Sequence, residues 1–337
     1  MTQTQIQQTQ TLLQEAKDIV IIPHKNPDGD AMGSTLALYH YLIKKGHRPV
    51  VIAPNNYPQF LQWLPGNNQV LIYETSTKAA NQKIQEAQLI FTLDFNDLSR
   101  VGLMENVLQE VAAPFVMIDH HQQPSEYAQV TYSDPKMSST CEMVYHFIEA
   151  LGDKSLIDID MGACLYTGIM TDTGSFRFSS TTPTTHRVIA NIMELGVPAV
   201  KIHQNIYDNN RVAKFQLLGR ALNNLIVLPE FKAAYITLTQ KELEQYDFQK
   251  GDTEGFVNYA LSISGVELAA IFIENKQEKI IKISFRSKSS FSVNEFARAH
   301  FSGGGHTNAA GGRSLTSLEN TVKEFINLLS SYSELAP

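Results

Sequence analysis

Histidine and aspartate side chains follow an apolar run near the start of the sequence. The run IVII at 19–22 leads into PHKNPDGDAMGS, which brings His24, Asp28 and Asp30 close together in the chain. Buried charges are costly unless they are paired or bound to a cation. We therefore expect these three side chains to bind a cation at the end of a buried strand.

Three more segments combine an apolar run with acids or histidines. They read LIFTLDFND, FVMIDHHQ and LYTGIMTDTGSF, and the last of these runs has a helical pattern. The residues that they contribute are Asp94, Asp119, His120, His121 and Asp172. Because the carboxyl ends of parallel strands form one edge of an α/β sheet, where ligands bind, these side chains can converge despite their distance in sequence.

So many acids in one crevice require cations. Two divalent metal ions roughly 3.5–4 Å apart, bridged by one carboxylate, would neutralise them, and such pairs are common in phosphoryl hydrolysis. Mixed imidazole and carboxylate ligands favour Mn²⁺, with Mg²⁺, Co²⁺ or Zn²⁺ as alternatives. A single strand-end aspartate is more often a helix cap or a turn residue, and we expect this simpler role for Asp97 and Asp134.

The spacing of apolar residues predicts the elements that carry these segments. Strand-like runs at 19–22, 49–53, 69–73, 89–93 and 115–118 alternate with helical patterns such as 31–45 and 100–112. This alternation predicts an α/β fold with a mainly parallel, doubly wound sheet. Later in the chain, a mostly helical stretch at 139–226 precedes strand-like runs at 232–238, 266–274 and 279–287 and a helix at 317–331. We therefore predict an N-terminal domain at 1–182, a helical connector at 183–229 and a smaller α/β domain at 230–337.

Length and composition narrow the class of protein. A chain of 337 residues is long enough for two domains. Its net charge of −7 argues against a protein that grips long duplex nucleic acid. The two cysteines form no disulfide framework, and neither a signal peptide nor a membrane-spanning run is visible. We therefore expect a soluble cytoplasmic protein that does not bind membranes.

The four segments, taken together, resemble the DHH phosphoesterase superfamily, whose name describes the triplet Asp119-His120-His121. The first family motif matches His24-x-x-x-Asp28-x-Asp30, the second Asp94 and the fourth Asp172. This resemblance implies one metal ion on His24, Asp28 and Asp94. It implies a second on Asp30, Asp94, His120 and Asp172, with Asp94 as the bridge. His121 would face the scissile phosphate, and Asp119 would orient a histidine ring or a loop.

A glycine-rich segment near the C-terminus also resembles this superfamily. The sequence FSGGGHTNAAGG at 301–312 is similar to the C-terminal domain that accompanies the DHH domain, and it contains Gly303, Gly304, Gly305 and His306. We expect a short helix of small residues after it. Backbone N–H groups of the glycines and of the helix N-terminus would then attract a phosphate. A tight packing turn is the alternative. The resemblance implies that Arg286 and this motif hold the far end of a substrate in a cleft between the domains.

The compact length fits the branch of small oligoribonucleases that are also pAp phosphatases. The resemblance thus implies a hydrolase that releases nucleoside monophosphates from very short single-stranded RNA and converts 3′-phosphoadenosine 5′-phosphate (pAp) to AMP. The alternatives are a phosphodiesterase for pApA or c-di-AMP and a type II inorganic pyrophosphatase. The expected partners are short oligonucleotides and small nucleotides. The sequence does not decide between a monomer and a homodimer.

Overall fold

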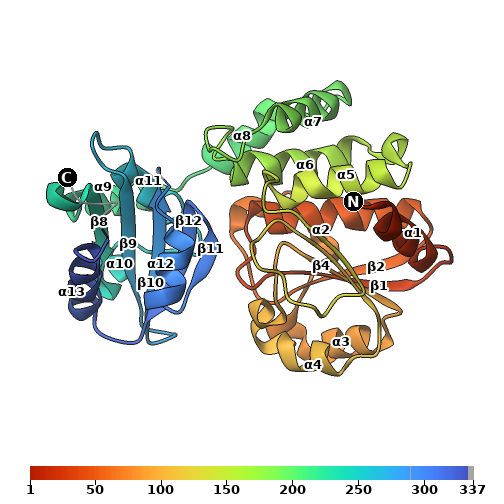
Figure 1. Cartoon of the computed structure of the whole chain (residues 1–337), viewed down its shortest axis with the longest axis horizontal. Helices are drawn as coiled ribbons and strands as arrows, with labels where there is room; N and C mark the ends of the chain where they lie inside the picture. The colour runs from red at the N-terminus through yellow and green to blue at the C-terminus, as the bar shows by residue number, and fades with distance from the viewer. Residues whose placement is uncertain (289, 333–337) are drawn as a thin grey trace. The chain divides into compact units, whose positions relative to one another are not determined.

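The computed structural model describes residues 1–288 and 290–332 of the chain. It separates into two compact units, Met1–Asn209 and Asn210–Pro337, and each unit is built around its own six-stranded sheet (Figure 1). The helices of the predicted connector, 183–229, are divided between them, because the boundary at Asn209 falls inside that range. Helix α7 (Pro183–Glu194) and helix α8 (Ala199–Tyr207) belong to the first unit, whereas α9 (Val212–Asn223) belongs to the second.

The sheet of the first unit is fully parallel, with the strand order β3-β2-β1-β4-β5-β6. Its strands are β1 (Asp18–Pro23), β2 (Arg48–Ala53), β3 (Leu71–Ile72), β4 (Leu89–Leu93), β5 (Phe115–Asp119) and β6 (Val130–Ser133). This order confirms the predicted doubly wound sheet. It reverses direction between β1 and β4, and ligands of such sheets bind beside the carboxyl ends of the strands at that point.

Helices cover both faces of this sheet, with α2, α5 and α6 on one face and α3 and α4 on the other (Figure 1). The helices of the first unit, besides α7 and α8, are α1 (Gln3–Leu12), α2 (Gly29–Lys44), α3 (Tyr73–Glu86), α4 (Glu105–Glu110), α5 (Thr140–Ala150) and α6 (Ile159–Asp172). Successive residues of β1 point to opposite faces. Ile19 and Ile21 enter the core under α2, α5 and α6, whereas Val20 and Ile22 enter the core under α3 and α4. The apolar run is continuous because both faces are covered.

Helices α2 and α6 approach each other closely. A Cβ atom added to Gly33 of α2 would lie 2.5 Å from the carbonyl oxygen of Cys164 in α6. A Cβ atom added to Gly168 of α6 would lie 3.0 Å from the Cα of Asp30. These two glycines therefore allow the contact that brings the end of α6 beside the start of α2.

The second unit contains a mixed sheet with the order β11-β12-β10-β9-β8-β7, in which only β8 and β9 pair in parallel. Its strands are β7 (Ile226–Leu228), β8 (Ala233–Leu238), β9 (Leu268–Asn275), β10 (Ile280–Ser287), β11 (Gly304–His306) and β12 (Ala309–Ser314). Its helices, besides α9, are α10 (Gln240–Gln245), α11 (Phe256–Leu261), α12 (Val293–His300) and α13 (Leu318–Leu329). Two apolar cores form around this sheet, and one of them contains Phe285, Phe296 and Phe325.

One sequence-based prediction of local structure was too long and another was wrong. The strand predicted at 69–73 is present as β3 but has only two residues, because Tyr73 already begins α3. The short helix expected after the glycine motif is instead the antiparallel hairpin of β11 and β12. A Cβ atom at Gly305 would lie 2.5 Å from the carbonyl oxygen of Ala309. The glycines thus allow two strands to pack tightly, and the helix-dipole argument for phosphate binding no longer applies there.

In the described part of the chain, none of the helices is both long enough and apolar enough to cross a bilayer.

Candidate metal centre

The predicted metal ligands of the first unit lie at the edge where the parallel strands end. His24 follows β1 and Asp94 follows β4, on the two sides of the point where the strand order reverses. Asp94 has a left-handed backbone, with φ of 66°, and its N–H donates to the carbonyl of Ile118 at 3.1 Å. Positive φ is uncommon for residues other than glycine and is often found at functional sites. The turn ends the strand and directs the carboxylate toward His24 and His120.

His24, Asp28 and Asp94 form a first cluster. The Nε2 atom of His24 lies 3.8 Å from Asp28 Oδ2 and 3.4 Å from Asp94 Oδ2. The other ring nitrogen, Nδ1, lies 2.8 Å from the carbonyl oxygen of Lys25. A ring that donates Nδ1–H to a carbonyl presents the Nε2 lone pair to a cation. Asp28 also caps α2, because its Oδ1 accepts the N–H groups of Asp30 and Ala31 at 3.0 Å. The cap uses Oδ1, and Oδ2 lies beside His24, so Asp28 can cap α2 and still be a candidate ligand.

A second cluster surrounds His120. Its Nε2 atom lies 3.6 Å from Asp30 Oδ2, 3.5 Å from Asp94 Oδ1 and 3.5 Å from Asp172 Oδ2. Its Nδ1 atom lies 3.2 Å from the carbonyl oxygen of Met137. This ring is thus oriented like that of His24, with Nε2 directed at carboxylates. Asp172 ends α6, so the close packing of α6 on α2 delivers it to this cluster.

The two oxygens of Asp94 face different clusters. Oδ2 lies beside His24 of the first cluster, and Oδ1 lies beside His120 of the second. A carboxylate in this position can bind two cations at once, one through each oxygen. The geometry agrees with the bridging role that the sequence resemblance implies for Asp94.

Burial and mutual repulsion make this group of carboxylates unfavourable without a cation. Asp30 and Asp94 are only 1% and 2% exposed. Burial raises the pKa of both carboxyl groups, and for Asp94 the neighbouring Asp30 and Asp28 raise it further. Burial lowers the pKa of His120, but Asp172, Asp30 and Asp94 outweigh it and raise the value to about 9. A divalent cation would replace that proton, and this donor set of imidazole nitrogen and carboxylate oxygen fits Mn²⁺, Mg²⁺, Co²⁺ or Zn²⁺.

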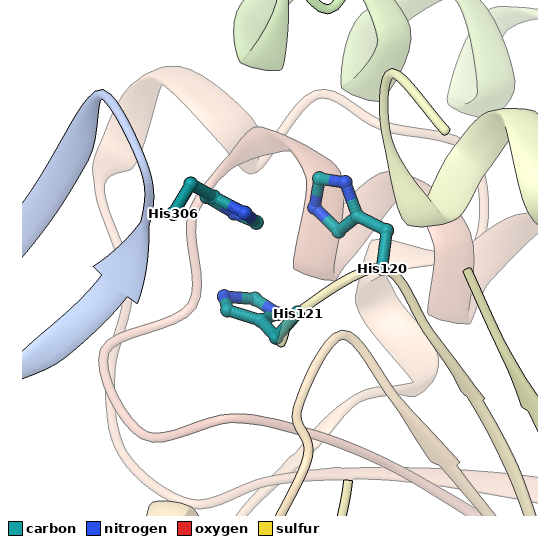
Figure 2. Close-up of side chains that lie close together, drawn as sticks. All are labelled: His120, His121 and His306. Atoms are coloured by element: carbon teal, nitrogen blue, oxygen red, sulfur yellow. The ribbon is translucent and has the colours of Figure 1, made fainter. Parts of the chain in front are cut away.

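His121 is held differently from His120, although the two residues are adjacent. Their rings are inclined by 77° and project in different directions (Figure 2). The Nδ1 atom of His121 lies 2.7 Å from Asp119 Oδ1. Burial, followed by the neighbouring His120, holds the pKa of His121 well below its ordinary value. Burial raises the pKa of Asp119 to about 6. The Asp119 carboxylate thus accepts a hydrogen bond from Nδ1 and fixes the direction of the His121 ring.

Sequence reasoning missed the residues that orient the ligands. Thr140 and Cys141 donate hydrogen bonds to Asp30 from the start of α5. The sequence SSTCE does show a helix start, because Ser139 caps α5 by accepting the N–H of Glu142 at 3.0 Å. It does not show which distant carboxylate those residues contact. Asp97 caps a short 3₁₀ helix, and Asp134 accepts the N–H of Lys136 in a turn, so both have the simpler roles expected.

The predicted substrate-binding residues lie in the second unit, on β10, β11 and the turn before β11. In the sheet register, Ala309 of β12 lies opposite Arg286 on one side and opposite His306 on the other. Residues that lie opposite each other point to the same face of a sheet. Arg286 and His306 therefore flank a small alanine on one face, while Phe285 enters the core on the other. Lys288 has a structural role, because its Nζ donates to the carbonyl of Val266 at 2.9 Å.

Comparison with known protein families supports this two-unit organisation. Residues 18–169 match a family model described as "DHH family, N-terminal domain". Residues 231–334 match a model described as "DHHA1 domain". The first range contains all the ligands described above except Asp172, and the second contains Arg286 and the glycine motif.

Individual relatives cover most of the chain. It is 30% identical to the bifunctional oligoribonuclease and PAP phosphatase NrnA of Thermus thermophilus, over 87% of this chain and 83% of that protein. A crystal structure of an exopolyphosphatase-related protein from Bacteroides fragilis has a TM-score of 0.93 and 37% identity, over 99% and 98% of the two chains. RecJ of Thermus thermophilus in complex with Mn²⁺ shares the fold, with a TM-score of 0.57 and 13% identity, over 100% of this chain and 56% of RecJ.

Proposed function

The chain belongs to the DHH family, and from this premise we propose that it is a phosphoester hydrolase that uses two divalent metal ions, with Mn²⁺ as the preferred ion. The observation that carries the proposal is Asp94, whose two carboxylate oxygens face two separate groups of ligands. Two bound cations would activate water and stabilise negative charge on a phosphoryl group.

The roles of the protein's own residues follow from their contacts. His24, Asp28 and Asp94 would hold one cation, and Asp30, Asp94, His120 and Asp172 the other. His121 is the candidate for the group that contacts the scissile phosphate, because its ring lies beside the ligands while its Nδ1 is engaged by Asp119. Because Asp119 accepts the hydrogen bond from Nδ1, the ring would donate from Nε2 to the developing phosphoryl charge only in its protonated form, and that donor would stabilise the transition state.

We propose that the substrates are very short single-stranded RNA and pAp, which the enzyme would cleave to nucleoside monophosphates and to AMP. The name of the Thermus thermophilus relative supports this substrate class. The second unit supports it as well, since Arg286 and His306 on one sheet face offer donors to a phosphate. A net charge of −7 disfavours long duplexes. We also propose a cytoplasmic location, in which Cys141 and Cys164 remain free thiols as they are here.

A turnover panel with Mn²⁺ tests the proposal. The substrates would be pAp, pApA, RNA oligomers of about two to ten nucleotides, c-di-AMP and pyrophosphate. We expect the highest kcat/KM for pAp and the shortest oligomers, and no turnover in the Asp94→Ala variant. A preference for pyrophosphate, or for c-di-AMP over every linear substrate, would replace the proposed function with that of a pyrophosphatase or a cyclic-dinucleotide phosphodiesterase.

A further inference from the structure

The turn at 137–141, which includes the first two residues of α5, contacts three of the four residues of the second cluster. The carbonyl of Met137 engages His120 Nδ1 at 3.2 Å. The N–H groups of Thr140 and Cys141 donate to Asp30 Oδ2 and Oδ1 at 2.6 and 2.8 Å. The hydroxyl of Thr140 donates to Asp94 Oδ1 at 2.9 Å. One short segment thus orients an imidazole and two carboxylates that are distant from it in sequence.

These contacts are specific for the second cluster. The Thr140 hydroxyl reaches Asp94 Oδ1, which faces His120, and not Oδ2, which faces His24. Both oxygens of Asp30 accept backbone N–H groups, so the plane of that carboxylate is fixed. In the described part of the chain, the hydrogen bonds of His24 and Asp28, the two residues that belong to the first cluster alone, involve Lys25, Asp30 and Ala31 and not this turn.

Burial and further hydrogen bonds fix the position of this turn. Thr140 is 0% exposed. The carboxylate of Glu142, one turn into α5, accepts hydrogen bonds from Ser138 and, at 2.9 Å, from Thr185 of α7. A hydroxyl that donates from a braced, dry position orients a carboxylate more firmly than one on a mobile loop, because little entropy remains to be lost.

We propose that Thr140 is a positioning residue that raises the metal affinity of the second cluster without binding the metal itself. The proposal deepens the two-metal function proposed above and rests on it. A hydrogen bond to one oxygen of Asp94 fixes the rotation of the bridging carboxylate, so that Oδ1 remains directed at the cation. Partners of this kind typically change metal affinity by about 10–100-fold when they are removed.

The first part of the test compares Thr140→Val with Thr140→Ser. Valine keeps the branched shape and removes the donor, whereas serine keeps the hydroxyl. Mn²⁺ binding to the metal-free protein would be measured by calorimetry, with elemental analysis for stoichiometry. We expect the wild type and Thr140→Ser to bind two ions. In Thr140→Val, the affinity of the second cluster for its ion should be roughly 10–100-fold lower. Equal binding by all three proteins, or equal losses in both variants, would overturn the proposal.

The second part assigns the effect to one cluster. In a His24→Ala background, which removes a ligand of the first cluster, Thr140→Val should still weaken the remaining ion. In an Asp172→Ala background, which removes a candidate ligand of the second cluster, Thr140→Val should have little effect on the affinity for the remaining ion. Such cycles isolate the coupling between neighbouring residues. Losses of the same size in both backgrounds would mean that Thr140 supports the fold rather than the second cluster.

Folding is checked by thermal denaturation of the metal-free variants. If Thr140→Val does not fold, Thr140→Ala replaces it, and the same cluster-selective loss is expected relative to Thr140→Ser. Because the readout is metal binding, the result is separate from the proposed substrates. A wild-type protein that binds two Mn²⁺ ions but hydrolyses no nucleotide would refute the proposed function and leave the inference about Thr140 standing.

Discussion

Asp94 combines two properties that rarely occur in one residue, a left-handed backbone and a nearly complete burial of its charge. Asparagine tolerates the left-handed region, whereas alanine does so poorly. The two substitutions therefore separate the role of the carboxylate from that of the turn.

We expect Asp94→Asn to fold normally and still to lose turnover of every phosphoester, because the charge shared by the two clusters is gone. Asp94→Ala should lose activity as well and should also unfold at a lower temperature. Elemental analysis beside turnover and thermal denaturation checks both statements. Full activity with two bound Mn²⁺ ions in Asp94→Asn would show that this carboxylate is not a bridge.

His121 should matter for rate more than for metal binding. Its Nδ1 is engaged by Asp119, and it lies outside the two groups of ligands assigned above. His121→Ala should therefore keep about two metal ions per chain while kcat falls by roughly 10²–10³, the cost of losing one donor to the transition state. Metal content and single-turnover rates test this. Poor metal binding that excess Mn²⁺ restores, together with the rate, would make His121 a ligand.

At the scale of elements, the packing of α2 on α6 positions candidate ligands from both helices. A side chain at Gly33 would collide with the backbone of α6 near Cys164, and helix backbones cannot shift locally without moving the whole helix. The same contact sets the position of Asp172 at the end of α6.

We expect Gly33→Ala to destabilise the protein by about 1–3 kcal/mol and to weaken metal binding, because α6 must move outward. Gly219→Ala is the matched control. Gly219 lies in α9, and a Cβ atom added to it would meet no atom within 4 Å, so alanine there should stabilise the protein by about 0.5–1 kcal/mol. Denaturant unfolding and Mn²⁺ titration of both variants provide the comparison. Wild-type stability in Gly33→Ala would contradict the close approach of the two helices.

Strands with long apolar runs can be predicted from the sequence, whereas short strands and strands of small residues cannot. The strands β1, β4 and β5 are buried on both faces, so each appears as an apolar run, interrupted only by Thr92 in β4, and is followed by polar candidate ligands. The short strand β6 leaves no such run and was not predicted. The hairpin of β11 and β12 is not predictable from the sequence because its small residues carry no alternating apolar pattern and the hairpin depends on a close backbone approach. Thr140 was not found because its contact with Asp94 spans a long stretch of chain.

At the scale of the whole molecule, the metal centre and Arg286 belong to different units. If both units act on one substrate, Arg286→Ala should lower kcat/KM for pAp and dinucleotides by roughly ten- to a hundredfold, since a charge-assisted hydrogen bond contributes about 1.5–3 kcal/mol. Hydrolysis of a small activated ester such as bis-(p-nitrophenyl) phosphate should change little. Equal losses on both kinds of substrate would assign Arg286 to the stability of the fold.

The order of the ligands along the chain has a consequence for biosynthesis. His24 is the first ligand to leave the ribosome and Asp172 is the last, and α7, which braces the turn before α5, begins only at Pro183. Domains fold as units during synthesis, the N-terminal one first. A nascent chain that stops before α6 carries most of the ligands but cannot close the second cluster. The proposed hydrolytic activity is therefore expected only after nearly the whole first unit has been translated, and a shorter product should lack it.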